Sequence, residues 1–176
     1  MKKIFAFVLA CMFVFVSGCG SEVSAEVVEV KNGYFDLSAD EFETNFNSLL
    51  GDEYTTANIG SAYVDEDSAF YSCDLQDGIR LSVLATPDST MLSAVELSCD
   101  PFENSEASTS IGYYFAKLIY TVEPAATAEE IYSIADEIDI EKPLPGDHEI
   151  AVRGDIIYSL RIDDSCKMYF SAIASK

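Results

Sequence analysis

Few residues in this 176-residue chain have the type and spacing that catalysis requires. His148 is the only histidine, and it lies between Asp147 and Glu149. Nucleophilic catalysis needs a base oriented beside the nucleophile, and no serine is singled out as a partner for His148. The G-x-S-x-G, H-E-x-x-H and C-x-x-C patterns are missing from the sequence. We therefore expect His148 to be a turn histidine, and we name no catalytic residue.

Carboxylates are the second chemically active group. Asp and Glu number 31 against 10 Lys and Arg, which gives a formal net charge of −21. Paired carboxyls could do acid/base chemistry without histidine, so a carboxylate-based hydrolase is an alternative, although nothing distinguishes one pair. The densest clusters, residues 65–67 and 163–164, lack the spaced ligands and central glycine of an EF-hand loop, so we predict solvated turns, no metal site and no cofactor.

The negative charge also bears on partners. Nucleic acids and anionic lipid surfaces are bound through Lys and Arg, and this chain has few of either. We predict no nucleic-acid partner. Basic proteins, cations and neutral glycans are compatible with the charge.

Cysteine is the third reactive type, and Cys19 stands apart from the others. It follows MKK, an uncharged apolar run from Ile4 to Val16, and Ser17-Gly18. A positive start, an apolar run of about 7–15 residues and small residues at the junction have the form of a secretory signal. A permanent membrane helix needs about 20 apolar residues, so this run is too short to be one.

The stretch Val16-Ser17-Gly18-Cys19 resembles the lipobox of bacterial lipoproteins: an aliphatic residue, two small residues and a cysteine. The resemblance implies that the Cys19 thiol carries a diacylglycerol and that the chain is cut just before it. Residues 1–18 would then be the signal peptide, 19–33 a lipidated tether and 34–176 a single folded domain. It also implies a location in the bacterial cell envelope, lipid-anchored to a membrane with the domain outside the cytoplasm. Ordinary secretion, with cleavage after Ala25, is the alternative.

The later cysteines are Cys73, Cys99 and Cys166, which allow at most one internal disulfide. If residues 69–75, 79–85 and 91–99 form a meander, one strand separates Cys73 from Cys99, and the distance of at least ~9 Å is too long for a bridge. Cys99 ends its strand and Cys166 begins one. A disulfide, if one forms, is therefore expected between Cys99 and Cys166; three reduced thiols are the alternative.

Hydrophobic periodicity defines the elements that hold these residues. Capping boxes at Ser38 and Thr127 predict helices over residues 38–51 and 127–138, and apolar residues at helical spacing predict another over 104–122. Alternating apolar and polar residues between turn sequences predict strands near residues 57–64, 69–75, 79–86, 92–99, 149–154, 155–163 and 166–173.

This order predicts an α+β domain, with an antiparallel sheet and helices packed on one face. By element order the chain is loosely similar to secretion-chaperone-like folds, and less so to the repeat of β-lactamase-inhibitor proteins. We expect a membrane-anchored lipoprotein that binds a protein or another envelope component. Helix packing explains most of Tyr113, Tyr114 and Tyr120, and exposure of one of them as a partner anchor is the alternative. Two facing buried carboxyls would instead favour a hydrolase. An enclosed apolar cavity would favour a carrier of small apolar ligands.

Overall fold

The computed structural model describes residues 28–60, 62–100, 107–139 and 144–175 as an antiparallel sheet with helices on one face. This confirms the predicted α+β class. The predicted signal peptide, Cys19 and most of the tether lie outside the described residues. The strands are β1 (Val30–Lys31), β2 (Tyr34–Phe35), β3 (Tyr63–Val64), β4 (Ala69–Asp74), β5 (Arg80–Ala85), β6 (Leu92–Cys99), β7 (His148–Arg153), β8 (Ile156–Ile162) and β9 (Met168–Ala174), and the helices are α2 (Ala39–Ser48), α3 (Ala107–Val122) and α4 (Ala128–Glu137).

The sheet joins two meanders that are far apart in the sequence. Its order is β3-β4-β5-β6-β9-β8-β7, and each neighbouring pair is antiparallel. The joint is the β6–β9 ladder, in which Val95 lies opposite Ala172 and Cys99 opposite Met168. The β1–β2 hairpin is attached to the start of β6 through Phe35 and Leu92.

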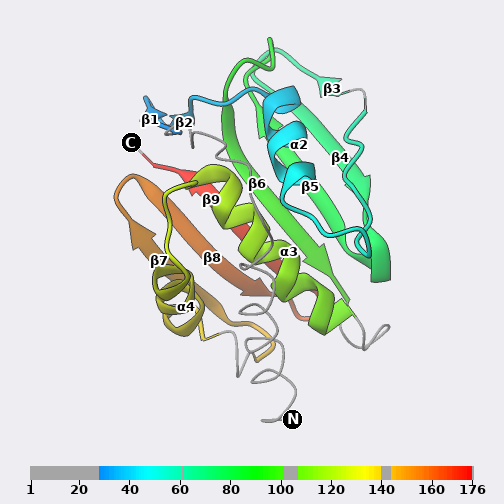
Figure 1. The fold of residues 1–176 in the computed structure, drawn as a ribbon, viewed down its shortest axis with the longest axis vertical. Coiled ribbons are helices and arrows are strands. Elements are labelled where there is room, and N and C mark those ends of the chain that lie inside the picture. The colour runs from blue at the N-terminus through cyan, green and yellow to red at the C-terminus, as the bar shows by residue number, and fades with distance from the viewer. Residues whose placement is uncertain (1–27, 61, 101–106, 140–143, 176) are drawn as a thin grey trace.

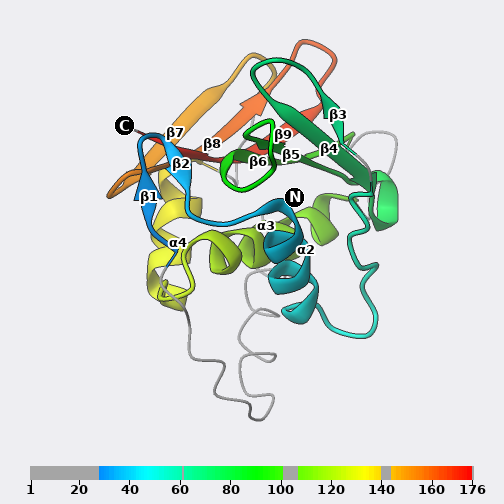
Figure 2. The same ribbon diagram turned by 90° about the horizontal axis from the view of Figure 1, so that it is seen from above.

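All three helices cover the same face of the sheet (Figures 1 and 2). The strand residues that point toward them are almost all buried, as alternation predicts for a sheet with one covered face. Leu81, Leu97, Tyr158 and Phe170 are fully or almost fully buried there. The core therefore lies between the helix layer and this covered face.

Capping boxes in the sequence determine where two of the helices begin. Ser38 accepts a hydrogen bond from the Glu41 backbone N–H at 3.2 Å while the Glu41 carboxylate accepts one from the Ser38 N–H at 2.9 Å. Thr127 and Glu130 make the same reciprocal pair at the start of α4. Both predicted capping boxes are confirmed, and each satisfies backbone donors that a helix start leaves unpaired.

The first predicted strand is much shorter than expected. Among the described residues of 57–64, which are 57–60 and 62–64, only Tyr63 and Val64 are in a strand. The Asn47 side-chain amide of α2 bonds both the N–H and the C=O of Ala57, at 2.7 and 2.9 Å, and Glu43 accepts from the Ile59 N–H at 2.9 Å. Side chains of a helix thus take the backbone groups that a neighbouring strand would have paired.

A search of the described residues for a helix long and apolar enough to cross a membrane found none.

Candidate functional site

Figure 2 shows the face of the sheet opposite the helices, here called the open face. The strand order and registers arrange its residues in three rows across the strands. The ladder registers place residues of successive strands side by side, and every second residue of a strand points to this face. We name these rows the apolar row (Tyr63, Phe70, Leu84, Ala94, Ile173, Ile157, Val152), the serine row (Ser72, Ser82, Glu96, Ser171, Ser159, Ile150) and the arginine row (Asp74, Arg80, Ser98, Tyr169, Arg161, His148).

The apolar row runs across all seven strands of the sheet's main path. Apart from Ala94, its members are large, and most are partly in water: Tyr63 is 75% exposed, Val152 52%, Phe70 43%, and Leu84 and Ile173 37% each. Single exposed apolar residues are ordinary, but a contiguous apolar strip marks a contact surface. The alternation of apolar and polar residues in the strands had predicted that this face is more polar than the covered face. The apolar row becomes visible only when the order and register of the strands are known.

The serine row lies between two rows of longer side chains. Ser159 and Ser171 are almost fully buried, although none of the described helices lies on this face, because neighbouring side chains shield them. The Ser171 hydroxyl donates a hydrogen bond to the Glu96 carboxylate at 3.2 Å across the β6–β9 joint. The centre of the open face is therefore built largely of small hydroxyl groups beside one carboxylate.

The arginine row gathers cations in a chain that has few. Arg80 donates to Asp74 at 2.8 Å, and this hydrogen bond lowers the pKa of the Asp74 carboxyl. The Arg161 guanidinium lies 3.8 Å from the centre of the Tyr169 ring, and the Lys167 ammonium lies 5.5 Å from the same ring. An arginine held flat on an aromatic ring still presents its donors outward to a ligand.

His148 does not form a catalytic arrangement among the described residues. It is exposed at the start of edge strand β7, opposite Arg161, rather than in a turn as predicted. In the part of the chain that the structure describes, no hydrogen bond joins its imidazole to a serine or a carboxylate. Its place at the end of the arginine row was not visible from its neighbours in sequence.

The acidic clusters are turns. Asp65 accepts hydrogen bonds from the backbone N–H groups of Asp67 and Ser68, at 3.0 and 2.7 Å, and these bonds lower its pKa. Asp163 accepts from the hydroxyl of Ser165 at 2.6 Å, which is the main cause of its lowered pKa. Within the described ranges, no group of three or more metal-ligating side chains comes together. These carboxylates stabilise their own loops.

Several described carboxyls have a pKa below the ordinary value. Each carboxyl whose pKa is shifted has it lowered by hydrogen-bond donors, as at Glu41, Asp88 and Glu137. A general acid that is protonated at neutral pH requires the opposite shift, through burial or a second carboxylate. None of these shifted carboxyls is suited to that role.

The structure holds Cys73, Cys99 and Cys166 as free thiols. Leu81 lies between Cys73 and the Leu97 position of β6, so one strand separates Cys73 from Cys99 as the meander predicted. Cys99 lies opposite Met168, close to Cys166 in sequence, so the two strand ends meet. Burial raises the pKa of the Cys99 thiol to about 12. The Cys99–Cys166 disulfide stays a prediction.

The three tyrosines of α3 differ in their burial and contacts. Tyr114 is fully buried, donates its hydroxyl to the Thr55 carbonyl at 3.1 Å and belongs to the core, so it is a helix-packing residue and not a partner anchor. Tyr113 stacks on Tyr54 with ring centres 3.7 Å apart, and the Lys117 ammonium lies 5.0 Å from its ring. Partly exposed Tyr113 and Tyr120 thus lie on the outer side of the helix layer, away from the open face.

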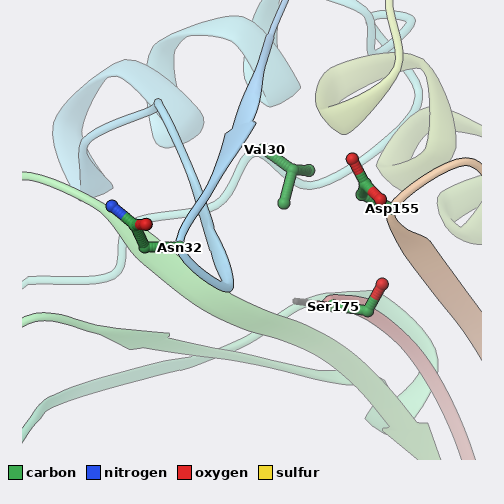
Figure 3. Close-up of a pocket in the computed structure, with 4 residues that line it drawn as sticks. All are labelled: Val30, Asn32, Asp155 and Ser175. Atoms are coloured by element: carbon green, nitrogen blue, oxygen red, sulfur yellow. The ribbon is translucent and has the colours of Figure 1, made fainter.

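One pocket lies at the end of the sheet where the β1–β2 hairpin meets the β7–β8 turn (Figure 3). It has a volume of about 530 Å³ and is lined by Val30, Asn32, Asp155 and Ser175. The Ser175 N–H donates to the Asp155 carbonyl at 2.7 Å, which closes the floor between the chain end and the turn. With a single carboxylate and no second titratable side chain in its lining, the pocket does not support acid/base chemistry.

Comparison with known proteins adds no function to this geometry: neither a protein-family description, nor a curated protein, nor a solved structure matches the chain.

Proposed function

We propose that this protein is a lipid-anchored protein of the bacterial cell envelope whose domain binds another protein through the open face of its sheet. The observation that supports binding is the apolar row. A soluble domain with so many acids has ample charge to cover its surface, yet it leaves a line of large apolar side chains in water on one face.

The position of the row is the second argument for binding. The helices leave this face uncovered, and the face carries two arginines and two carboxylates, so its formal charges cancel in a chain of net charge −21. Charged residues are depleted at the centres of protein interfaces, where desolvation is costly. The open face is thus the part of the described surface best suited to losing its water.

A crosslinking experiment tests this proposal in the full-length protein. A photoreactive amino acid replaces Leu84 on the open face, and in a control it replaces the exposed Asp136 of α4 on the helix side. In a bacterial host that carries the natural partner, we expect a discrete adduct from the Leu84 position and none from Asp136. Equal yields from both positions, or no adduct from either, would contradict binding through the open face.

The anchor is tested separately through Cys19. Replacing Cys19 with serine removes the thiol that would accept the lipid, and two or three acyl chains at ~0.8 kcal/mol per buried CH₂ would hold a protein on a membrane essentially permanently. We expect Cys19→Ser to move the protein from the membrane fraction to the soluble fraction. Unchanged fractionation and unchanged processing would overturn the lipid-anchor proposal without affecting the binding proposal.

A further inference from the structure

The three rows of the open face differ in chemistry and run side by side, which specifies a partner more closely than an apolar patch alone does. We propose that the open face receives an amphipathic helix of a partner protein, with the apolar stripe of that helix on the apolar row and acidic side chains on Arg80 and Arg161. The inference rests on the proposed function, because it assumes that this face binds a protein.

The spacing of the rows fits a helix. Each row is two residues from the next along every strand, so the apolar row and the arginine row are about 13 Å apart. An α-helix with its side chains is about 10–12 Å in diameter. On the four central strands the serine row has short side chains at Ser82, Ser171 and Ser159 and one carboxylate, Glu96, and Ser159 and Ser171 are almost fully buried. A helix lying over the serine row would therefore touch both flanking rows.

The length of the contact is set by the four central strands, β5, β6, β9 and β8. Three strand spacings amount to about 14 Å, which corresponds to about ten residues of helix. Arg80 is on β5 and Arg161 is on β8, so the two arginines lie at the ends of this span. A helix with acidic residues two or three turns apart on one flank would reach both.

Charge complementarity predicts that one flank of the partner helix is acidic. The apolar row carries no charge, whereas the opposite row presents two guanidinium groups, one stacked on Tyr169 and one bonded to Asp74 by a single nitrogen. Arginine has five donors in a planar fork, so both groups keep donors for a carboxylate of the partner.

One symmetric stacking of two copies of this chain brings like charges together. Stacking two open faces about a two-fold axis that runs along the strands, between β6 and β9, brings β5 of one copy over β8 of the other. Arg80 would then face Arg161 of the second copy, and both copies carry a net charge of −21. Like charges placed against each other oppose such a contact.

Two synthetic helical peptides test the proposal with the full-length protein. They share one apolar stripe, and their flank is glutamate in one and lysine in the other. Binding is measured by titration calorimetry in detergent at physiological ionic strength, for the unmodified protein and for Arg161→Glu, Leu84→Glu and Lys31→Glu. Lys31 lies in the β1–β2 hairpin, off the open face, so Lys31→Glu makes the same charge change as a matched control.

We expect the glutamate-flanked peptide to bind and the lysine-flanked peptide to bind at least tenfold more weakly. Arg161→Glu should weaken the glutamate-flanked peptide at least tenfold, Leu84→Glu should abolish its binding, and Lys31→Glu should change its affinity less than twofold. Circular dichroism of each variant shows that the fold is kept.

Three results would overturn the inference. One is tighter binding of the lysine-flanked peptide, which would show that attraction to the net negative charge of the chain, and not to the two arginines, determines the affinity. Another is an unchanged affinity for Arg161→Glu. The third is a dimer in sedimentation analysis that Leu84→Glu dissolves, which would make a second copy the occupant. If the Leu84 crosslinker gives its adduct while neither peptide binds, the helix proposal fails and the proposed function stands.

Discussion

Leu81 and Leu84 provide a direct test of which face of the sheet the helices cover. They lie three residues apart on β5 and point to opposite faces. Leu81 is fully buried under the helix layer, whereas Leu84 on the open face is 37% exposed. The same substitution to alanine should therefore have two different costs.

The magnitudes follow from burial. Leu→Ala removes three carbons, worth about 2.4 kcal/mol when fully buried at ~0.8 kcal/mol per CH₂, and at Leu81 the cavity left behind raises the cost into the range of about 2–5 kcal/mol. At Leu84 only about two thirds of that area is buried and solvent fills the space, so we expect about 1.5 kcal/mol or less. From these ranges the two variants should differ by at least about 0.5 kcal/mol.

Urea unfolding followed by circular dichroism measures both costs. We expect similar slopes of the unfolding free energy against urea and a lower midpoint for Leu81→Ala, because the substitutions change stability rather than the surface exposed on unfolding. In a domain of this size each kcal/mol should lower the melting temperature by about 2–4 °C. Equal costs at the two positions, or a larger cost at Leu84, would refute the placement of the helices and with it the open face.

Other parts of the structure give further predictions. Tyr158→Phe should lower the free energy of unfolding by about 1.5–3 kcal/mol in urea unfolding, because the buried hydroxyl donates to the Glu123 carboxylate at 2.9 Å; a loss below ~0.5 kcal/mol would show that the bond is not formed. Thr127→Ala should cost about 0.5–2 kcal/mol at pH 7 through the lost helix cap. Hydrogen bonds from the Thr127 backbone N–H and, second, from its hydroxyl lower the pKa of Glu130, so their stabilisation is present above the carboxyl's unfolded pKa and is lost as pH falls through its folded pKa. Thr127→Ala removes the share of the hydroxyl. The cost of Thr127→Ala should therefore shrink on acidification, and a cost that grows would contradict this. Mass spectrometry after alkylation at pH 8 should find Cys99 unmodified in native protein and modified in denatured protein, because the thiol is buried and its pKa is about 12.

Much of the fold follows from local sequence signals. The capping boxes begin α2 and α4 at the predicted residues because the reciprocal hydrogen bonds involve only neighbouring groups. The strong alternation in β5 and β8 likewise predicted which residues are buried. The predicted strand over residues 57–64 failed because its backbone is bonded by Asn47 and Glu43, a contact that no local pattern reports.

The candidate site was far less accessible from the sequence. Its residues are serines, alanines and isolated apolar residues whose local patterns resemble those of any half-exposed strand. The density of aromatics at Tyr113, Tyr114 and Tyr120 left helix packing and partner anchoring both open, and only the structure shows that Tyr114 is in the core. Composition indicates how many aromatic residues there are, but a helix face or a strand register decides which of them reach water.

By itself, the sequence determined the α+β class, the capped helix starts, the strongly acidic charge and the alternation that sends every second strand residue to one face. Only the tertiary structure decided that β6 pairs with β9, which puts Ala94 beside Ile173 and joins two meanders into one sheet. Register then decided the rows: a slip of two residues would place Leu84 opposite Glu96 instead of Ala94 and break the apolar row. The physical reason is that periodicity is local, whereas pairing between distant strands is chosen by the packing of the whole core.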